Sequence, residues 1–336
     1  MQSKITIIAG PTASGKTGRS LTLAKQLGAA IISADSRMVY QGLDIGTGKP
    51  TWEYRQFDRS PWINPRLVPT SEVTILRRAQ DSSEVKKAVH NLDPVYKIQG
   101  IDHYLLDVVQ PEISFTLTDW LERARRVLGG LERQGKPVVV IGGTGLYLKA
   151  LLQGFQPPPT DPLVRESLEK LATAEVFKKL LAVDPLTAQR EKNNRRRLVR
   201  ALEIFELTGQ PASMQHKNTP LSAEIIKITL PRTELFARID QRINDRLESG
   251  MIEEVIGLLV AGVSAAWLKS LGLEYRIITN WLLEQQNFQL THSNLPSWKG
   301  QVEVDKKDKG ELVARLQKEI HAYARRQETY LRTQLI

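Results

Sequence analysis

The feature that most constrains this sequence is a glycine-rich segment near its start. Residues 10–17 read GPTASGKT and satisfy the pattern GxxxxGK[ST] at every defined position. The apolar run Ile5–Ala9 before it is typical of a buried parallel strand, and a helical pattern of about Gly15–Leu27 follows. Ala30–Ala34 reads as a second strand. Strand, loop, helix and strand in this order predict an α/β fold with a parallel sheet flanked by helices.

The glycine-rich segment also predicts a site for a di- or triphosphate. Glycines let backbone amides converge on phosphate oxygens, and the start of a helix adds partial positive charge. Lys16 is expected to reach the outer phosphate and Thr17 to offer its hydroxyl to Mg²⁺. The pattern leaves open which phosphate compound is bound. The residues expected at the phosphates are Gly10, Pro11, Thr12, Ala13, Ser14, Gly15, Lys16 and Thr17.

Two other segments are expected at the same edge of the sheet, because each follows a predicted strand. Asp35 ends the second strand, and ligands of open α/β sheets bind beyond that end. Its carboxylate could hold the metal, accept a proton as a general base, or only cap a turn. The run Gly142–Gly145 follows the strand Pro137–Ile141. It is either a close approach to substrate, with Thr144 as its polar contact, or a bare glycine turn.

One predicted helix carries an arginine stripe. Arg238, Arg242 and Arg246 are spaced four residues apart and therefore share one face. They could reach a phosphate in a cleft or lie on a solvated face. The neighbouring apolar stripe consists of Leu235, Ile239, Ile243 and Leu247.

A second basic patch lies on the stretch Arg195–Arg197 with Arg200. Arginines grouped on one helix suit a nucleic-acid backbone. Glu203 and Glu206 on the same helix could instead balance them on a solvated face.

Composition narrows the class of protein. The 336 residues include 47 Lys and Arg against 37 Asp and Glu, a formal net charge of +10, which weakly favours a polyanionic partner. The absence of cysteine excludes disulfides, thiolate metal sites and cysteine nucleophiles. No apolar run approaches the roughly 18 residues that cross a bilayer, and the start does not resemble a signal peptide. A cytoplasmic protein that does not bind membranes is expected.

Three regions are predicted: a phosphate-loop core over 1–155, a helical insertion over 156–222, and the rest of the core with C-terminal helices over 223–336. Within the first, about 52–100 reads as a variable surface insertion, because prolines, tryptophans and charges break its periodicity. Further predictions are strands over 103–109 and 225–230, helices over 117–133, 234–261 and 311–332, and a loop over 287–310.

Several stretches together resemble the tRNA dimethylallyltransferases, also called tRNA isopentenyltransferases. They are GPTASGKT at 10–17, the run from Ser33 to Thr51, GGTGLYLKALL at 142–152, RRLVRALEIFELTG at 196–209, the run 232–255 and ARRQETYLR at 324–332. The resemblance implies transfer of a dimethylallyl group from dimethylallyl diphosphate to the exocyclic amine of the adenosine 3′ of the anticodon, in tRNAs that read codons beginning with U. It implies Mg²⁺, a fold related to P-loop kinases, and a helical insertion that grips the anticodon stem-loop. A monomer is expected.

The resemblance also implies roles for individual residues. Asp35 would be the general base, and the loop Thr12–Thr17 would hold the diphosphate of the prenyl donor. Arg242 would bind the leaving diphosphate from the opposite side, so that Thr12, Lys16, Asp35 and Arg242 form the catalytic set. The residues expected to contact tRNA are Asp35, Ser36, Arg37, Met38, Thr144, Arg165, Arg196, Arg197, Leu198, Val199 and Arg200.

The chain departs from the family pattern in two places, and two other activities stay open. Residues 52–100 inherit no role, and the usual glycine–tyrosine motif reads Leu271-Gly272-Leu273-Glu274-Tyr275. The alternatives are an isopentenyltransferase acting on free AMP, ADP or ATP, and a P-loop kinase of small molecules. The arginine patch at 195–200 disfavours the first, because a mononucleotide needs no extended basic surface.

Overall fold

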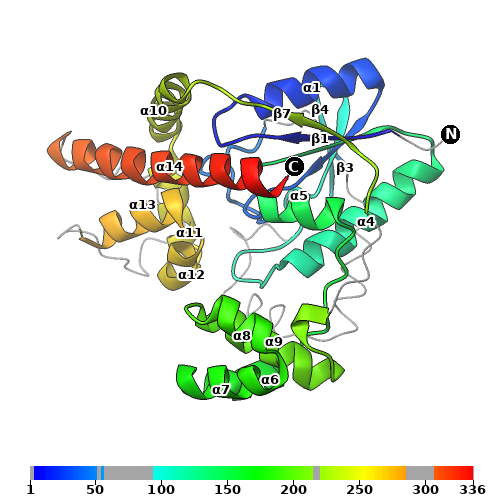
Figure 1. Cartoon of the computed structure of the whole chain (residues 1–336). Coiled ribbons are helices and arrows are strands. Elements are labelled where there is room, and N and C mark those ends of the chain that lie inside the picture. The colour runs from blue at the N-terminus through cyan, green and yellow to red at the C-terminus, as the bar shows by residue number, and fades with distance from the viewer. Residues whose placement is uncertain (1–3, 51–53, 57–93, 215–219, 285–305, 336) are drawn as a thin grey trace. The chain divides into compact units, whose positions relative to one another are not determined.

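The computed structural model describes residues 4–50, 54–56, 94–214, 220–284 and 306–335. The strands in these ranges form a seven-stranded sheet in the order β3-β4-β5-β2-β6-β1-β7 (Figure 1). From β5 to β7 all pairs are parallel, as an α/β fold with a parallel sheet predicts. The parallel strands are β1 (Ile5–Ala9), β2 (Ala30–Ser33), β5 (Ile101–Tyr104), β6 (Val138–Gly142) and β7 (Glu224–Lys227).

One end of the sheet is antiparallel, which the sequence did not predict. β3 (Tyr54–Gln56) pairs with β4 (Val95–Ile98), and β4 pairs with β5. Gln99 and Gly100 join β4 to β5, with φ of 50° and 74°. A two-residue turn with positive φ joins only antiparallel neighbours. The prediction of a surface insertion without regular structure over 52–100 is therefore wrong for residues 54–56 and 95–98, which form strands of the sheet. Residues 57–93 lie outside the described part.

Helices cover both faces of the sheet (Figure 1). Helix α1 (Lys16–Leu27) lies on one face, and α4 (Leu117–Arg133) and α5 (Gly145–Leu152) lie on the other. Under α1, Ala24 packs with Ile8, Ile31 and Val139 in one buried cluster. On the opposite face, the indole of the buried Trp120 donates to the carbonyl of Ser33 at 2.9 Å. The strands that lead to the phosphate loop and to Asp35 are thus held by helices packed on the sheet.

Two predicted elements are interrupted by backbone with positive φ. The strand expected over 103–109 ends at Tyr104, because Leu105 and Asp107 have φ of 63° and 53°. The single helix expected over 234–261 is two, α10 (Arg232–Glu248) and α11 (Met251–Val260). They are separated at Gly250, whose φ of 96° ends helical hydrogen bonding.

The C-terminal part of the chain completes the core. The apolar stripe of α10 is buried as predicted. Next come α12 (Ala265–Ser270), α13 (Leu273–Glu284) and the long α14 (Lys306–Gln334), which packs against α10 and α13. Because α14 begins at Lys306, the predicted loop over 287–310 is wrong for its last five residues, and 287–305 lie outside the described part.

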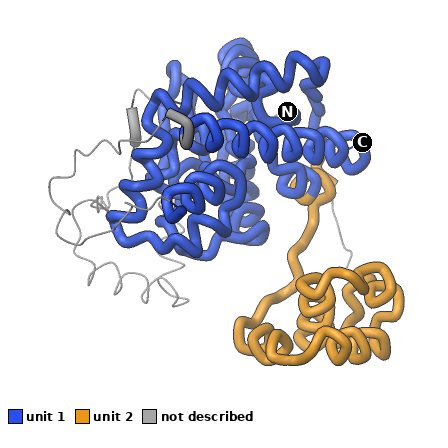
Figure 2. Tube along the Cα trace, turned by 90° about the vertical axis from the view of Figure 1, so that its left-hand side faces the viewer, with its two compact units in different colours: residues 1–149, 222–336 blue, residues 150–221 orange. Residues whose placement is uncertain are grey.

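The chain divides into two compact units (Figure 2). Residues 1–149 and 222–336 form the first, and Ala150–Leu221 form the second. The second unit is helical, and its ends meet because the amide of Leu221 donates to the carbonyl of Leu152 at 2.8 Å. A unit with adjacent ends can be inserted into another without disturbing it. Its elements are α6 (Pro162–Glu169), α7 (Thr173–Val183), α8 (Pro185–Glu191), α9 (Arg195–Thr208) and η1 (Ala212–Met214).

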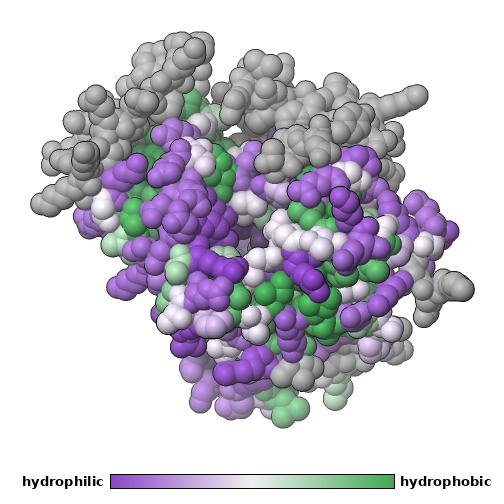
Figure 3. Space-filling model, turned by 90° about the horizontal axis from the view of Figure 1, so that it is seen from above, coloured by the Kyte–Doolittle hydropathy of each residue, from purple (hydrophilic) through white to green (hydrophobic). Residues whose placement is uncertain are grey.

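The described surface is predominantly hydrophilic on the face shown in Figure 3, with hydrophobic residues in separate patches between hydrophilic ones. Within the described ranges, no helix combines the length and the apolar character needed to cross a membrane.

Candidate active site

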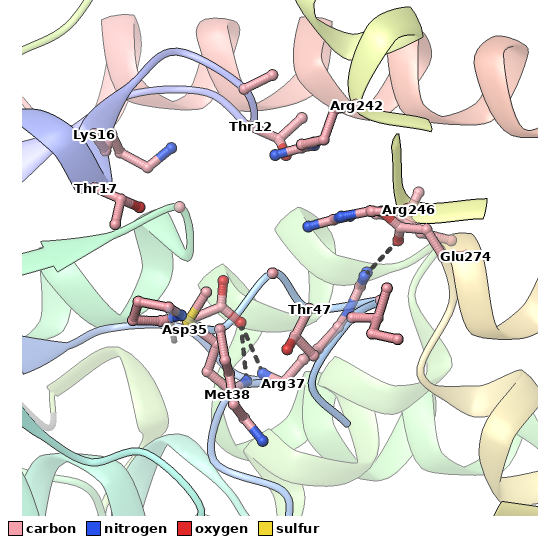
Figure 4. Close-up of a pocket in the computed structure, with 18 of the residues that line it drawn as sticks. Thr12, Lys16, Thr17, Asp35, Arg37, Met38, Thr47, Arg242, Arg246 and Glu274 are labelled. Atoms are coloured by element: carbon pink, nitrogen blue, oxygen red, sulfur yellow. Dashed lines mark hydrogen bonds and ion pairs between the residues drawn. The ribbon is translucent and has the colours of Figure 1, made fainter. Parts of the chain in front are cut away.

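The first unit contains a cavity of about 910 Å³ at the carboxyl ends of its strands. Its wall is formed by the phosphate loop, the loops 35–38 and 44–50, and Gly143 with Thr144. Helices α10, α13 and α14 contribute the rest. Figure 4 shows Lys16 and Arg242 extending into the same opening, with Asp35 across it. The structure therefore brings together residues that the sequence placed in four separate segments.

The phosphate loop has the backbone that its sequence predicts. Ala13 and Gly15 have φ of 60° and 84°, and Thr12 through Thr17 line the cavity. Gly10 and Pro11 support the loop from outside the lining. A Cβ on Gly10 would lie 2.7 Å from Oγ of Ser14 and 3.0 Å from the carbonyl oxygen of Ile228, so only glycine fits there.

Two cations of the cavity are held by neutral partners. Nζ of Lys16 donates to the carbonyl oxygen of Pro11 at 2.5 Å, and Nη2 of Arg242 donates to Oγ1 of Thr12 at 2.5 Å. Burial, together with repulsion from Arg242, lowers the pKa of Lys16 to about 8. Burial, together with repulsion from Arg246, lowers the pKa of Arg242 to about 10. Crowded, partly desolvated cations with no carboxylate on them form a strong anion site.

Asp35 has one carboxylate oxygen engaged and one open to the cavity. Oδ1 accepts the amides of Arg37 at 2.9 Å and Met38 at 3.3 Å, so Asp35 does shape a turn. Among the residues that the structure describes, none donates a hydrogen bond to Oδ2. The amide of Ser36 donates to Oγ1 of Thr144 at 3.2 Å, which joins this turn to the second glycine-rich loop. The turn and the proton-accepting role are therefore compatible.

A buried ion cluster forms the wall beside Asp35, and sequence reasoning missed its centre. The carboxylate of Glu274 accepts from Arg37 at 3.1 Å and from Arg246 at 3.0 Å (Figure 4). Burial would raise the pKa of Glu274, but the charges of Arg37 and Arg246 outweigh it and lower the pKa. The departure at residues 271–275 was the one sequence signal at this position. The third arginine of the stripe, Arg238, also lines the cavity and pairs with Glu234 at 2.7 Å.

A second missed residue, Glu254 of α11, holds the loop at 44–46. Its carboxylate accepts the amides of Asp44 at 2.8 Å, Ile45 at 2.6 Å and Gly46 at 3.1 Å. It also accepts the hydroxyl of Tyr275 at 2.7 Å. A Cβ on Gly46 would lie 2.7 Å from that tyrosine ring, so the close approach requires glycine.

The arginines of the second unit are mostly engaged with their own unit. Arg195 donates to the carbonyl oxygens of Glu169 and Leu171, both at 2.7 Å. Arg196 is exposed and has no ionic or hydrogen-bond partner within the described residues. Three others form ion pairs: Arg197 with Glu191 at 2.9 Å, and Arg165 and Arg200 with Glu203 at 2.7 and 2.9 Å.

Two residues predicted to contact tRNA are placed elsewhere. The side chains of Leu198 and Val199 belong to the hydrophobic core of the second unit, 0% and 3% exposed. They alternate with the arginines because the helix turns every 3.6 residues, so a continuous stretch cannot face one partner with every side chain.

The cavity offers a few oxygen atoms that could bind Mg²⁺. Thr17 and Asp35 line the cavity and offer oxygen atoms, which Mg²⁺ prefers. No group of three or more His, Asp or Glu that could hold a metal occurs within the described ranges. Mg²⁺ is often held by one or two protein oxygens together with phosphate oxygens and water, and the residues here fit that arrangement.

Comparisons with known proteins show which proteins this chain is similar to. The family model described as IPP transferase matches residues 92–334, and the model described as isopentenyl transferase matches 3–93. A tRNA dimethylallyltransferase of Geobacter metallireducens is 36% identical over 289 residues, which is 82% of this chain and 79% of the relative. The tRNA dimethylallyltransferase 1 of Citrifermentans bemidjiense is 32% identical over 334 aligned residues, which are 97% of this chain and 88% of the relative.

A solved structure is similar over almost the whole chain. The crystal structure of a tRNA delta(2)-isopentenylpyrophosphate transferase from Staphylococcus epidermidis is 26% identical, with a TM-score of 0.55. The match covers 99% of this chain and 91% of that one.

Proposed function

We propose a function from the premise that this chain belongs to the tRNA dimethylallyltransferase family. The protein is a prenyltransferase that modifies tRNA. The dimethylallyl group moves from dimethylallyl diphosphate to the exocyclic amine of an adenosine, and diphosphate is released. The observation that carries this proposal is that Lys16 and Arg242 face Asp35 across one cavity.

The cavity has a side suited to the leaving group. An allylic diphosphate loses its carbon–oxygen bond when the negative charge that builds on the departing oxygens is stabilised. Lys16, Arg242 and the amides of the phosphate loop present positive charge and donors there. Mg²⁺, when bound, would supply further neutralisation, with Thr17 as the residue whose hydroxyl would hold it.

The opposite side is suited to the nucleophile. As the new bond forms between the amine nitrogen and the allylic carbon, the amine must lose a proton. Oδ2 of Asp35 is the acceptor, because Oδ1 is held by the two amides of its turn. A stacked base cannot enter such a cavity, so the adenosine must leave the stack, as bases do in enzymes that modify them.

The finer details of the partner follow from the family resemblance. We propose the adenosine 3′ of the anticodon, in tRNAs reading codons that begin with U, with the second unit contacting the anticodon stem-loop. Among the arginines predicted to contact tRNA, Arg196 is the one with no hydrogen-bond or ionic partner among the described residues, so its charge is available to a phosphate. The monomeric state and the cytoplasm remain predictions.

The experiment is incubation of the protein and Mg²⁺ with dimethylallyl diphosphate and unmodified tRNA, followed by mass spectrometry of the nucleosides. The expected product is dimethylallyladenosine at one position, with pyrophosphate released and ATP not consumed. Parallel reactions replace tRNA by AMP or ATP. Prenylated mononucleotide without prenylated tRNA, or phosphoryl transfer from ATP to a small acceptor, would contradict the proposal.

A further inference from the structure

Helix α14 places a polar side chain where its pattern calls for an apolar one. The other buried side chains described on this helix are Leu312, Leu316, Ile320, Ala324 and Leu331. Gln327 occupies the same stripe and is 8% exposed. Burying an amide is costly unless both of its ends are hydrogen-bonded. The position therefore indicates a specific task for this amide.

Both ends of the Gln327 amide are bonded to loops of the active site. Oε1 accepts the backbone amide of Thr12 at 2.8 Å, across 315 residues of sequence. Nε2 donates to the carbonyl oxygen of Gly143 at 2.8 Å. A Cβ on Gly143 would lie 2.8 Å from Nε2, so the glycine is what admits the amide. Only a group with one acceptor and one donor satisfies both loops at once.

These two bonds complete a chain of contacts from the leaving-group side of the cavity to the base. Arg242 donates to Thr12, whose amide donates to Gln327. Gln327 donates to Gly143, and the neighbouring Thr144 accepts the amide of Ser36, next to Asp35. Gln327 thus adds a side-chain link between the phosphate loop and the loop beside Asp35, beyond the pairing of strands β1 and β6.

We propose that Gln327 is a positioning residue for the transfer reaction. It fixes the distance between the site that holds the diphosphate and the carboxylate that accepts the proton. The role of Gln327 in the transfer reaction rests on the proposed function. The effect of Gln327 on the phosphate loop can be measured without that function. Because reacting groups must meet within a few tenths of an ångström, a loosened link costs rate without any loss of fold.

The test exploits the shape of glutamic acid. In Gln327→Glu, a protonated carboxyl can accept from Thr12 and donate to Gly143, as the amide does. The ionised form loses the donor and adds a negative charge beside the diphosphate. We expect kcat/KM for dimethylallyl diphosphate to fall about 10²-fold at alkaline pH. Relative to wild type at each pH, it should recover at least about fivefold toward mildly acidic pH, where a larger fraction of the carboxyl is protonated.

Two further variants isolate the cause. Gln327→Met keeps the shape but loses both bonds, and should lower kcat/KM by a factor that does not change with pH. Gln334→Glu, at an exposed position further along α14 that bonds Lys149, should leave kcat/KM unchanged. The affinity of each variant for tRNA and its melting temperature are measured in parallel.

The outcomes separate this proposal from the proposed function. Wild-type activity of Gln327→Glu at alkaline pH, or an equal loss at every pH, would overturn the positioning role. If Gln327→Glu does not fold, wild-type kcat/KM in Gln327→Met would overturn it. The affinity for inorganic pyrophosphate, measured by calorimetric titration, does not depend on prenyl transfer. There, weaker binding by Gln327→Glu that recovers toward acidic pH supports the link even if wild-type protein does not prenylate tRNA.

Discussion

At the scale of single residues, the active site separates charges according to their task. Lys16 and Arg242 are held by a carbonyl and a hydroxyl oxygen, so their charges remain available to an anion. Arg37 and Arg246 share the carboxylate of Glu274 instead. Their charges are partly neutralised, and they form a rigid wall next to Asp35. The strongest positive potential is thereby concentrated at the phosphate loop.

Asp35→Asn tests the base directly. An asparagine Oδ1 can still accept the two amides of the turn, so the loop should persist while the proton acceptor is lost. We expect the single-turnover rate to fall about 10²–10⁴-fold, the usual contribution of a general base. Affinity for tRNA and for the donor should stay near wild type. A single-turnover rate close to wild type would exclude Asp35 as the base.

Lys16 gives the donor site a pH dependence. Its pKa is lowered to about 8, so the ammonium is present below that pH and is lost above it. The affinity of the free enzyme for dimethylallyl diphosphate should therefore weaken about tenfold from about pH 7 to pH 9. Calorimetry without tRNA measures this. Lys16→Arg, which stays charged, should show a flat profile, and a flat wild-type profile would contradict the assignment.

At the scale of elements, helices from the C-terminal half hold loops from the N-terminal half. Glu254 of α11 satisfies three consecutive amides of the loop at 44–46. A carboxylate can accept several amides at once because it has two oxygens and no donor. The loop that lines the cavity is thus ordered by a helix that starts more than two hundred residues later.

Glu254→Gln should loosen that loop. The amide replaces one acceptor oxygen by an NH₂ group that faces other donors, so a buried polar group loses its partner. We expect the free energy of unfolding to fall by about 1–3 kcal/mol, together with faster proteolysis within residues 40–50. The matched control is Glu253→Gln, an exposed position on the same helix, expected to change stability by less than about 0.5 kcal/mol. Equal effects in both variants would refute the role of Glu254 in holding the loop at 44–46.

At the scale of the whole molecule, the chain forms two compact units with different features. The cavity and all of its lining belong to the first unit, while the second has its own hydrophobic core. The basic stretch of α9 serves two purposes within that second unit. Arg195 binds the carbonyl oxygen of Glu169 at the end of α6 and the hydroxyl of Thr173 at the start of α7, whereas the side chain of Arg196 is exposed.

Arg196→Ala and Arg195→Ala should therefore differ. The proposed contact of Arg196 with a tRNA phosphate is lost in Arg196→Ala, so the slope of log affinity for tRNA against log salt should flatten by about one unit, with an unchanged melting temperature. Removing Arg195 loses its hydrogen bonds to two carbonyl oxygens that are exposed or partly buried, and should cost about 0.5–1.5 kcal/mol of stability. An unchanged salt slope in Arg196→Ala would return it to the status of a solvated surface residue.

Much of the site follows from local chemistry that a sequence displays. The phosphate loop is determined by glycine backbone, a preceding strand and a helix start, all within about a dozen residues. The buried stripe of α10 follows from a spacing that tertiary packing left intact. The edge position of Asp35 follows from the polarity of a parallel sheet. These parts could be predicted because short-range geometry decides them.

The rest was decided by packing between distant segments. Nothing near Thr12 in sequence indicates Gln327, 315 residues away, and nothing near Arg37 indicates Glu274, 237 residues away. Likewise, the arginines at 195–200 look alike in sequence. Only their neighbours in space show which of them form hydrogen bonds or ion pairs and which has no partner among the described residues. A buried polar group takes its partner from whichever element packs against it, so its role is fixed by the tertiary structure and not by its own segment.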